Sequence, residues 1–118
     1  MKEGLMTGKF EIKTATDRQF HFNLVATNGQ VILSSQLYTA KASAQNGIES
    51  VKVNAPIDSQ YDRRMSKSDE PYFVLKAANG EIIGTSEMYS SKQAMENGID
   101  SVKHNAPEAG VEDLTLSS

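Results

Sequence analysis

Two sets of polar side chains, spaced 51 residues apart, could together bind a ligand. They are Tyr38, Lys41 and Ser50 in the first half of the chain, and Tyr89, Lys92 and Ser101 in the second half. Each set combines a phenol, an ammonium group and a hydroxyl, which can hydrogen-bond to a polar ligand and pair with a negative charge. We interpret the repeated serines first as structural, because serines and asparagines near a helix end also bond to the backbone. The functional alternative is that the six residues line twin symmetric pockets.

Catalytic or metal chemistry has little support in the sequence. The two histidines, His21 and His104, are replaced by Tyr72 and Val53 at the equivalent positions of the other half. The chain has no cysteine, no recognisable nucleophile–base pair and no glycine-rich phosphate loop at the start of a helix. We therefore expect no enzyme activity, no cofactor and no bound metal.

A basic segment offers a different kind of site. Arg63, Arg64 and Lys67 lie close together in the second half, and Lys52 and Lys103 lie near predicted helix ends. Such a cluster could bind phosphate groups or nucleic acid through its charge. However, the net charge is -3 and the pI is about 5.3. Basic and aromatic residues also do not alternate as they do in single-strand binders. Nucleic acid is thus our second choice of partner.

The 51-residue spacing comes from an internal repeat, which decides the architecture. Residues 20–56 align with residues 71–107 without a gap, and 18 of these 37 positions are identical. Two units are too few for a solenoid. We therefore expect one globule with internal pseudo-two-fold symmetry.

In each repeat, an alternating apolar run predicts a strand and an Asn-Gly pair predicts a tight turn. The turn residues are Asn28 and Gly29 in the first repeat, and Asn79 and Gly80 in the second. Asn-Gly favours a two-residue type I′ turn between antiparallel strands. That turn would place Ala26 opposite Val31.

Each hairpin has a predicted strand before it, at residues 10–14 and 61–65, and a predicted helix after it, at residues 40–53 and 91–104. Gly47 and Gly98 fall on the apolar stripe of these helices. A glycine inside a helix costs roughly 1 kcal/mol relative to alanine. Its presence in both copies therefore predicts a close approach of helix to sheet, where a Cβ would not fit.

These patterns together predict an α+β fold of two tandem strand–strand–strand–helix repeats, with antiparallel sheet or sheets each covered by one helix. Residues 9–57 and 60–108 form the repeats of a single domain spanning residues 1–118, and residues 109–118 form a flexible tail. Whether the repeats share one continuous sheet or build two packed sheets is left open by the sequence.

The repeated pattern FxLxAxNGxxIxxSxxYxxKxxxxNGIxSVKxNAP, which starts at Phe22 and again at Phe73, resembles the YegP-like family of uncharacterised bacterial proteins. The resemblance implies a small α+β protein. It also implies that single-unit members pair and that tandem members such as this chain are similar to a fused dimer. No reaction, cofactor or substrate follows from it.

The sequence therefore favours a non-enzymatic binding or interaction module, with nucleic-acid or phosphate binding through the basic segment as the alternative. We expect the partner to be a protein or small ligand, and self-association through a sheet edge is a further option. The chain has no apolar run of the ~18 residues that a membrane span needs. We accordingly expect a cytoplasmic protein without a membrane partner.

Overall fold

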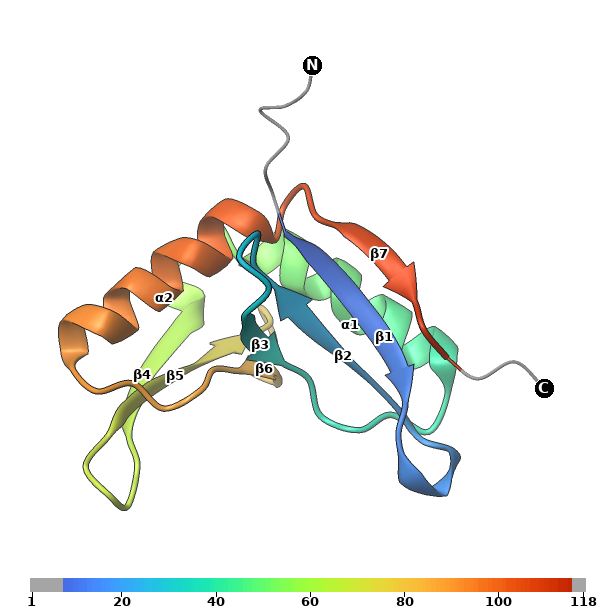
Figure 1. The fold of residues 1–118 in the computed structure, drawn as a ribbon, viewed down its shortest axis with the longest axis horizontal. Coiled ribbons are helices and arrows are strands. Elements are labelled where there is room, and N and C mark those ends of the chain that lie inside the picture. The colour runs from blue at the N-terminus through green and yellow to red at the C-terminus, as the bar shows by residue number, and fades with distance from the viewer. Residues whose placement is uncertain (1–7, 116–118) are drawn as a thin grey trace.

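The computed structural model describes residues 8–115, which form an α+β fold of two helices and one sheet (Figure 1). Within these residues the sheet has seven strands in the order β4-β5-β6-β3-β2-β1-β7. The bounds are β1 Lys9–Thr14, β2 Phe20–Val25, β3 Val31–Ser34, α1 Lys41–Asn54, β4 Tyr61–Met65, β5 Pro71–Lys76, β6 Ile82–Thr85, α2 Lys92–Asn105 and β7 Gly110–Asp113. Short 3₁₀ turns, Thr16–Arg18 and Asp58–Gln60, precede β2 and β4.

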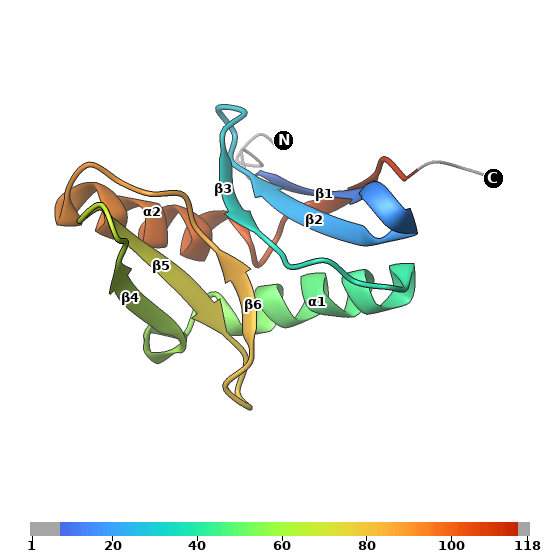
Figure 2. The same cartoon turned by 90° about the horizontal axis from the view of Figure 1, so that it is seen from below.

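The predicted tandem repeats are confirmed, and they share one sheet. The first repeat contributes β1, β2, β3 and α1, and the second contributes β4, β5, β6 and α2. Each helix covers strands of its own repeat and also touches the inner strand of the other, α1 against β6 and α2 against β3 (Figure 2). A single cluster of buried apolar residues therefore runs through both halves.

The helices lie where the apolar stripe predicts them, displaced by one residue at each end. Ala44, Ile48 and Val51 are buried along α1, and their equivalents Met95, Ile99 and Val102 are buried along α2. The start of α2 is capped by Ser91, whose side chain accepts a hydrogen bond from the Ala94 amide. Alanine takes this position in α1, which has no side-chain cap.

The Asn-Gly turns are present, but the predicted two-residue type I′ geometry is wrong. The Gly29 amide donates to the Ala26 carbonyl, and the Ala26 amide donates to the Gln30 carbonyl. This is a three-residue loop with one left-handed residue, Gly29, at φ +88°. The extra residue shifts the register, so Val25 and not Ala26 lies opposite Val31. Gly80 takes the same conformation, at φ +89°.

The two halves of the sheet meet at a narrow junction between β3 and β6. Ser34 pairs with Thr85, its equivalent in the second repeat, so the pseudo-two-fold axis passes between them. Beside this pair, Leu33 and Gly84 are also equivalent positions. A Cβ added to Gly84 would lie 2.6 Å from the Leu33 side chain, so the leucine occupies the space that a second side chain would need.

The prediction of a flexible tail was wrong for part of residues 109–118. Gly110–Asp113 form β7, which pairs in parallel with β1, and Ala109 is buried. The Leu114 amide donates to the Ile12 carbonyl at 2.8 Å, which continues the pairing by one residue. A four-residue acidic strand has no apolar alternation of its own, so its pairing with distant β1 is not visible locally. Residues 116–118 lie outside the described range.

The Leu33–Gly84 contact predicts a compensating exchange across the axis. Leu33→Gly should destabilise the fold by about 2–5 kcal/mol through a cavity, and Gly84→Leu by about 1–3 kcal/mol through overpacking. The double variant Leu33→Gly/Gly84→Leu moves the same leucine to the equivalent position, so it should lose much less than the sum. Urea denaturation of the four proteins measures this coupling, and simple additivity would contradict it.

Candidate functional site

Tyr38 and Tyr89 lie on the two helical glycines, which explains why the sequence keeps glycine there. A Cβ on Gly98 would lie 2.2 Å from the Tyr89 hydroxyl oxygen, and one on Gly47 would lie 2.7 Å from that of Tyr38. Each tyrosine ring also stacks on a core phenylalanine at a centroid distance of 6.3 Å. The close approach predicted at the glycines is therefore chiefly to a tyrosine ring, joined at Gly47 by Phe22.

Ser50 and Ser101 belong to hydrogen-bonded helix ends. The Asn54 side-chain amide donates to the Ser50 carbonyl at 2.8 Å and to its hydroxyl at 3.3 Å, and Asn105 does the same to Ser101 at 2.8 and 3.1 Å. The Asn54 Oδ1 then accepts from Gln60 Nε2 at 3.1 Å. These contacts tie the end of each helix to a neighbouring segment, so the serines help to hold the fold.

Lys41 and Lys92, the remaining members of the twin sets, have different surroundings. Lys41 forms an ion pair with Asp113 of β7 and donates to the Thr115 hydroxyl at 3.1 Å. Lys92 makes no hydrogen bond or ion pair with any residue in the 8–115 range. In neither repeat does a hydrogen bond or ion pair join the tyrosine, lysine and serine. Of the two lysines, Lys92 is exposed and has no polar partner among residues 8–115, whereas Lys41 is engaged by β7.

Lys92 lies on a groove between α2 and the outer strand β4. The groove has a volume of about 330 Å³. It is lined by Arg63, Arg64, Met65, Pro71, Lys92, Met95 and Glu96. Met65 is 50% exposed, so an apolar surface is available beside the charged groups. This groove brings together two of the three predicted basic residues with one of the predicted lysines.

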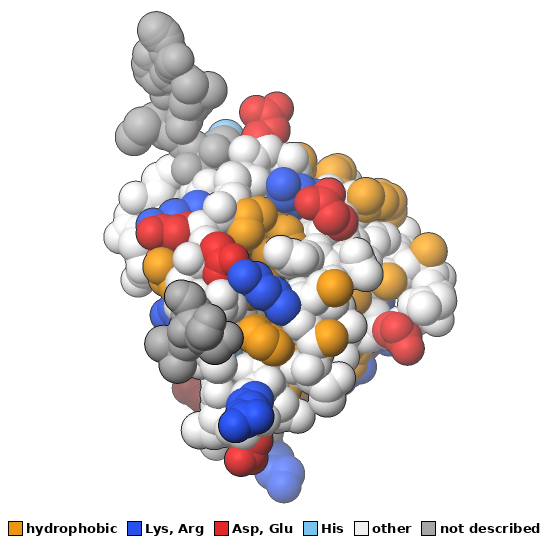
Figure 3. Space-filling model, turned by 90° about the vertical axis from the view of Figure 1, so that its right-hand side faces the viewer, with side chains coloured by type: hydrophobic (Ala, Val, Ile, Leu, Met, Phe, Trp, Pro, Cys, Tyr) orange, Lys and Arg blue, Asp and Glu red, His pale blue; other side chains and the backbone are white. Residues whose placement is uncertain are grey.

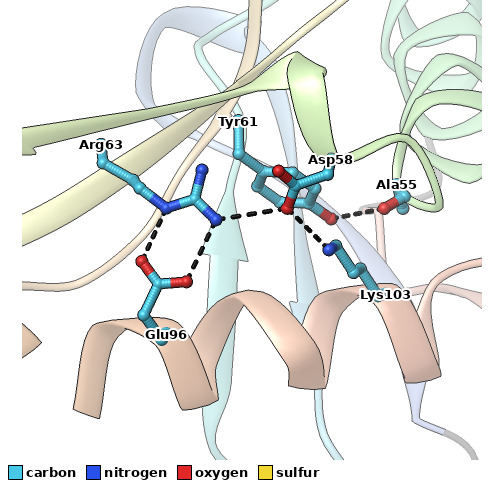
Figure 4. A network of polar contacts seen from close by, with 6 residues as sticks. All are labelled: Ala55, Asp58, Tyr61, Arg63, Glu96 and Lys103. Atoms are coloured by element: carbon cyan, nitrogen blue, oxygen red, sulfur yellow. Dashed lines mark hydrogen bonds and ion pairs between the residues drawn. The ribbon is translucent and has the colours of Figure 1, made fainter. Parts of the chain in front are cut away.

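Arg63 is held on the α2 side of β4 by two carboxylates (Figure 4). Its Nε and Nη2 donate to the two oxygens of Glu96 at 2.6 and 3.0 Å, and Nη2 also donates to Asp58 at 3.2 Å. Lys103 donates to the same Asp58 oxygen at 2.8 Å. Hydrogen bonds from these cations hold the pKa of Asp58 and that of Glu96 below their ordinary values.

Tyr61 anchors this network to the core. It is buried, and its hydroxyl donates to the Ala55 carbonyl at 2.7 Å (Figure 4). Burial raises the pKa of Tyr61 well above its ordinary range, so the phenol stays neutral. Lys103 lies 5.7 Å from its ring centroid, as Lys52 lies 5.9 Å from that of Phe10 in the first repeat. The helix-end lysines therefore have repeated packing roles.

The predicted basic cluster does not converge on one ligand. Arg64 pairs with Asp62, which also pairs with Lys76. Lys67 lies in the exposed β4–β5 turn and has no ion pair within residues 8–115. The face that carries β7 is likewise mixed, with acidic and basic side chains interspersed among separate apolar patches (Figure 3). Arg63 and Arg64 are thus both paired with carboxylates, which the sequence pattern alone does not reveal.

The two histidines, the candidates for metal or acid–base chemistry, lie on different elements. His21 is half-buried in β2 and His104 is exposed near the end of α2. No group of three or more histidine, aspartate or glutamate side chains in this range could hold a metal ion. Neither described helix is long and apolar enough to cross a membrane.

The sequence pattern does not reveal that one outer strand has a covered edge and the other an open edge. β1 and β4 are equivalent, and they pair with β2 and β5 in the same register, Ile12 opposite Phe22 and Arg63 opposite Phe73. The outer edge of β1 carries β7, whereas the outer edge of β4 carries no strand among residues 8–115. The signal in the sequence is the replacement of a core isoleucine by Arg63.

The ion pair between Lys41 and Asp113 predicts a pH dependence for the attachment of β7. Hydrogen bonds from Lys41 and Thr115 lower the pKa of Asp113 to about 2, against about 3.9 in an unfolded chain. A lowered pKa means that this contribution is complete above about pH 4 and is lost as the pH falls through about 2. An NMR titration of the Asp113 carboxyl carbon in Lys41→Met should give a midpoint shifted up towards 3.9. The control Lys13→Met should keep the low midpoint, and an unchanged midpoint in Lys41→Met would contradict the pairing.

Comparisons with known proteins identify the family. The family model for a domain of unknown function, DUF1508, matches twice, at residues 15–62 and 66–113. A UPF0339 protein of Acinetobacter baylyi is 54% identical over 110 residues, 93% of this chain and 99% of that protein. The UPF0339 protein YegP of Yersinia pestis is 54% identical over 109 residues, 92% of this chain and 97% of that protein.

Two solved structures have the same fold. The solution structure of a UPF0339 protein from Shewanella oneidensis is 53% identical, with a TM-score of 0.89 and 95% of each chain covered. That of the E. coli protein yegP, described as a protein of unknown function, is 46% identical, with a TM-score of 0.91 and 97% and 98% of the chains covered. This chain therefore belongs to the DUF1508 family, as the resemblance to YegP-like proteins predicted.

Proposed function

We propose that this protein is a non-enzymatic interaction module of the cytoplasm, which binds an extended segment of another protein along the outer edge of β4. The observation that carries the proposal is that two equivalent outer strands, β1 and β4, differ in whether another strand pairs with their outer edge. β1 already binds a strand, β7, on its outer edge, and β4 has the same place in the second repeat without such a partner among residues 8–115.

The backbone of β4 is oriented to receive a strand. Ile12 uses its carbonyl to bind Leu114, so this carbonyl points away from β2. In an antiparallel pair, a residue whose carbonyl points outward also points its N–H outward. Because Arg63 has the same register on β5 as Ile12 has on β2, its N–H and carbonyl face the open edge. Main-chain hydrogen bonds of this kind provide affinity in strand addition.

The side chains of β4 make this edge selective. Long apolar edges pair with any strand and aggregate, and charged residues on an edge prevent this. β4 is five residues long and carries Asp62, Arg63 and Arg64, so an uncharged apolar strand would leave these groups poorly solvated. The edge therefore suits a chosen partner better than unspecific sheet growth.

Nucleic-acid or phosphate binding is less well supported. A phosphate at Arg63 would have to compete with Glu96 and Asp58, which already bind the guanidinium. Arg64 is similarly engaged by Asp62. With a net charge of -3, the molecule also lacks a long-range attraction for a polyanion.

The edge can be tested by removing one backbone donor. Arg63→Pro deletes the outward N–H, and proline is tolerated on edge strands when that N–H faces solvent. Arg63→Ala removes the same guanidinium and keeps the N–H. We expect proteins captured from lysate by the wild type to be retained by Arg63→Ala and lost by Arg63→Pro, with thermal unfolding confirming that both variants fold. Equal capture by all three proteins would contradict binding at this edge.

A further inference from the structure

β7 shows how a strand fits the outer edge of a repeat. Val111 lies opposite Phe10 and Asp113 lies opposite Ile12. Val111 lines a surface groove on α1 together with Gln45, Asn46, Ile48 and Glu49. Asp113, two residues further on, shares the same face of the strand and forms an ion pair with Lys41 at the start of α1. The residue between them, Glu112, meets Lys9 at 2.5 Å.

Val111 and Asp113 are the two residues of β7 that face α1. The residues that they lie against have equivalents in the second repeat. Tyr61 corresponds to Phe10, Arg63 to Ile12 and Lys92 to Lys41. The groove of about 330 Å³ between β4 and α2 is open beside them, with Met65 and Met95 in its lining. Lys92 has no polar partner among residues 8–115. A carboxylate opposite Arg63 would thus meet an ammonium group that has no polar partner among residues 8–115. An apolar side chain opposite Tyr61 would lie against α2 at Glu96, Asn97, Ile99 and Asp100, the equivalents of the α1 residues that line the groove at Val111.

The position between these two residues differs between the repeats. Gln60 replaces Lys9, and its side-chain amide already donates to Asn54 at 3.1 Å and to the Lys76 carbonyl at 3.0 Å. The second repeat therefore has no cation that could pair with the middle residue of a bound segment, as Lys9 pairs with Glu112 in the first repeat. The exchange of Ile12 for Arg63 adds no free cation, because Glu96 and Asp58 already bind the guanidinium. The preference for an acidic third residue therefore depends on Lys92.

Resting on the proposed function, we infer that β4 binds an extended segment of a partner protein that runs parallel to it and carries the pattern apolar–any–acidic. The acidic side chain pairs with Lys92, and the apolar one packs against α2. This chain's own β7 has that pattern in Val111, Glu112 and Asp113. It is engaged on β1 by Lys41 and by the Leu114 amide, so the segment comes from another protein.

A peptide copy of β7 is the direct probe. The capped peptide AGVEDLT, residues 109–115, is titrated into the ¹⁵N-labelled full chain and followed by amide chemical shifts. We expect saturable shifts at Arg63–Met65 and at Lys92. Replacing the peptide aspartate by asparagine, or Lys92 by methionine in the protein, should weaken binding about two- to fivefold, the range of an exposed ion pair of up to about 1 kcal/mol. Combining both changes should weaken it no further.

The alternative outcomes separate this inference from the proposed function. Saturable binding that Arg63→Pro abolishes, but that neither the peptide carboxylate nor Lys92 affects, would overturn the acidic pattern and keep strand addition. Shifts confined to β1 and β7 would mean that the peptide replaces the chain's own strand, which overturns the inference. Concentration-dependent shifts of β4 without peptide, with a dimer in light scattering, would assign the edge to a second copy instead. Absence of binding at millimolar peptide would overturn the inference, and the capture experiment with Arg63→Pro would then decide the proposed function separately.

Discussion

The fold depends on an unequal contact at the pseudo-two-fold axis. Only Ser34 and Thr85 pair directly between β3 and β6, so side-chain packing must supply most of the stability of this junction. The Leu33 side chain occupies the space beside Gly84, which has no side chain of its own. Two identical chains would have to place the same residue at both positions, so a leucine on one side could not be matched by a glycine on the other. Fusion of the repeats removes that restriction, because each position can then change independently.

The same freedom extends to the outer strands. A single strand such as β7 can cover only one of the two equivalent edges. Here it covers β1, where Lys9 and Lys41 bind the acidic side chains of β7. At β4 the buried Ile12 is replaced by Arg63, whose guanidinium is bound by the carboxylates of Asp58 and Glu96. The two edges have thus become chemically distinct, while the core between them stays symmetric.

The sequence predicts elements whose signals are local. The alternation at β2 and the apolar stripe from Ala44 to Val51 place strand and helix to within a residue, because both record which side faces the core. The Asn28-Gly29 pair predicts a turn, but its length depends on how the flanking strands twist. β7 could not be predicted, since its stabilising partners, Ile12 and Lys41, lie more than 70 residues away.

In the candidate site, the residues that repeat and the residues that differ between the repeats have different roles. Tyr38, Ser50 and their equivalents were proposed as ligand contacts because they repeat, yet each supports a contact that both halves need, a ring on a helical glycine or a hydrogen bond at a helix end. In a duplicated chain, identical residues build the structure that the halves share. A site found in only one half must instead depend on positions where the repeats differ in residue or in partner. At Arg63 the residue itself differs, because the first repeat has Ile12 there. At Lys92 the residue is the same but its partner differs, because the ion pair that Lys41 makes with Asp113 has no counterpart in the second repeat among residues 8–115.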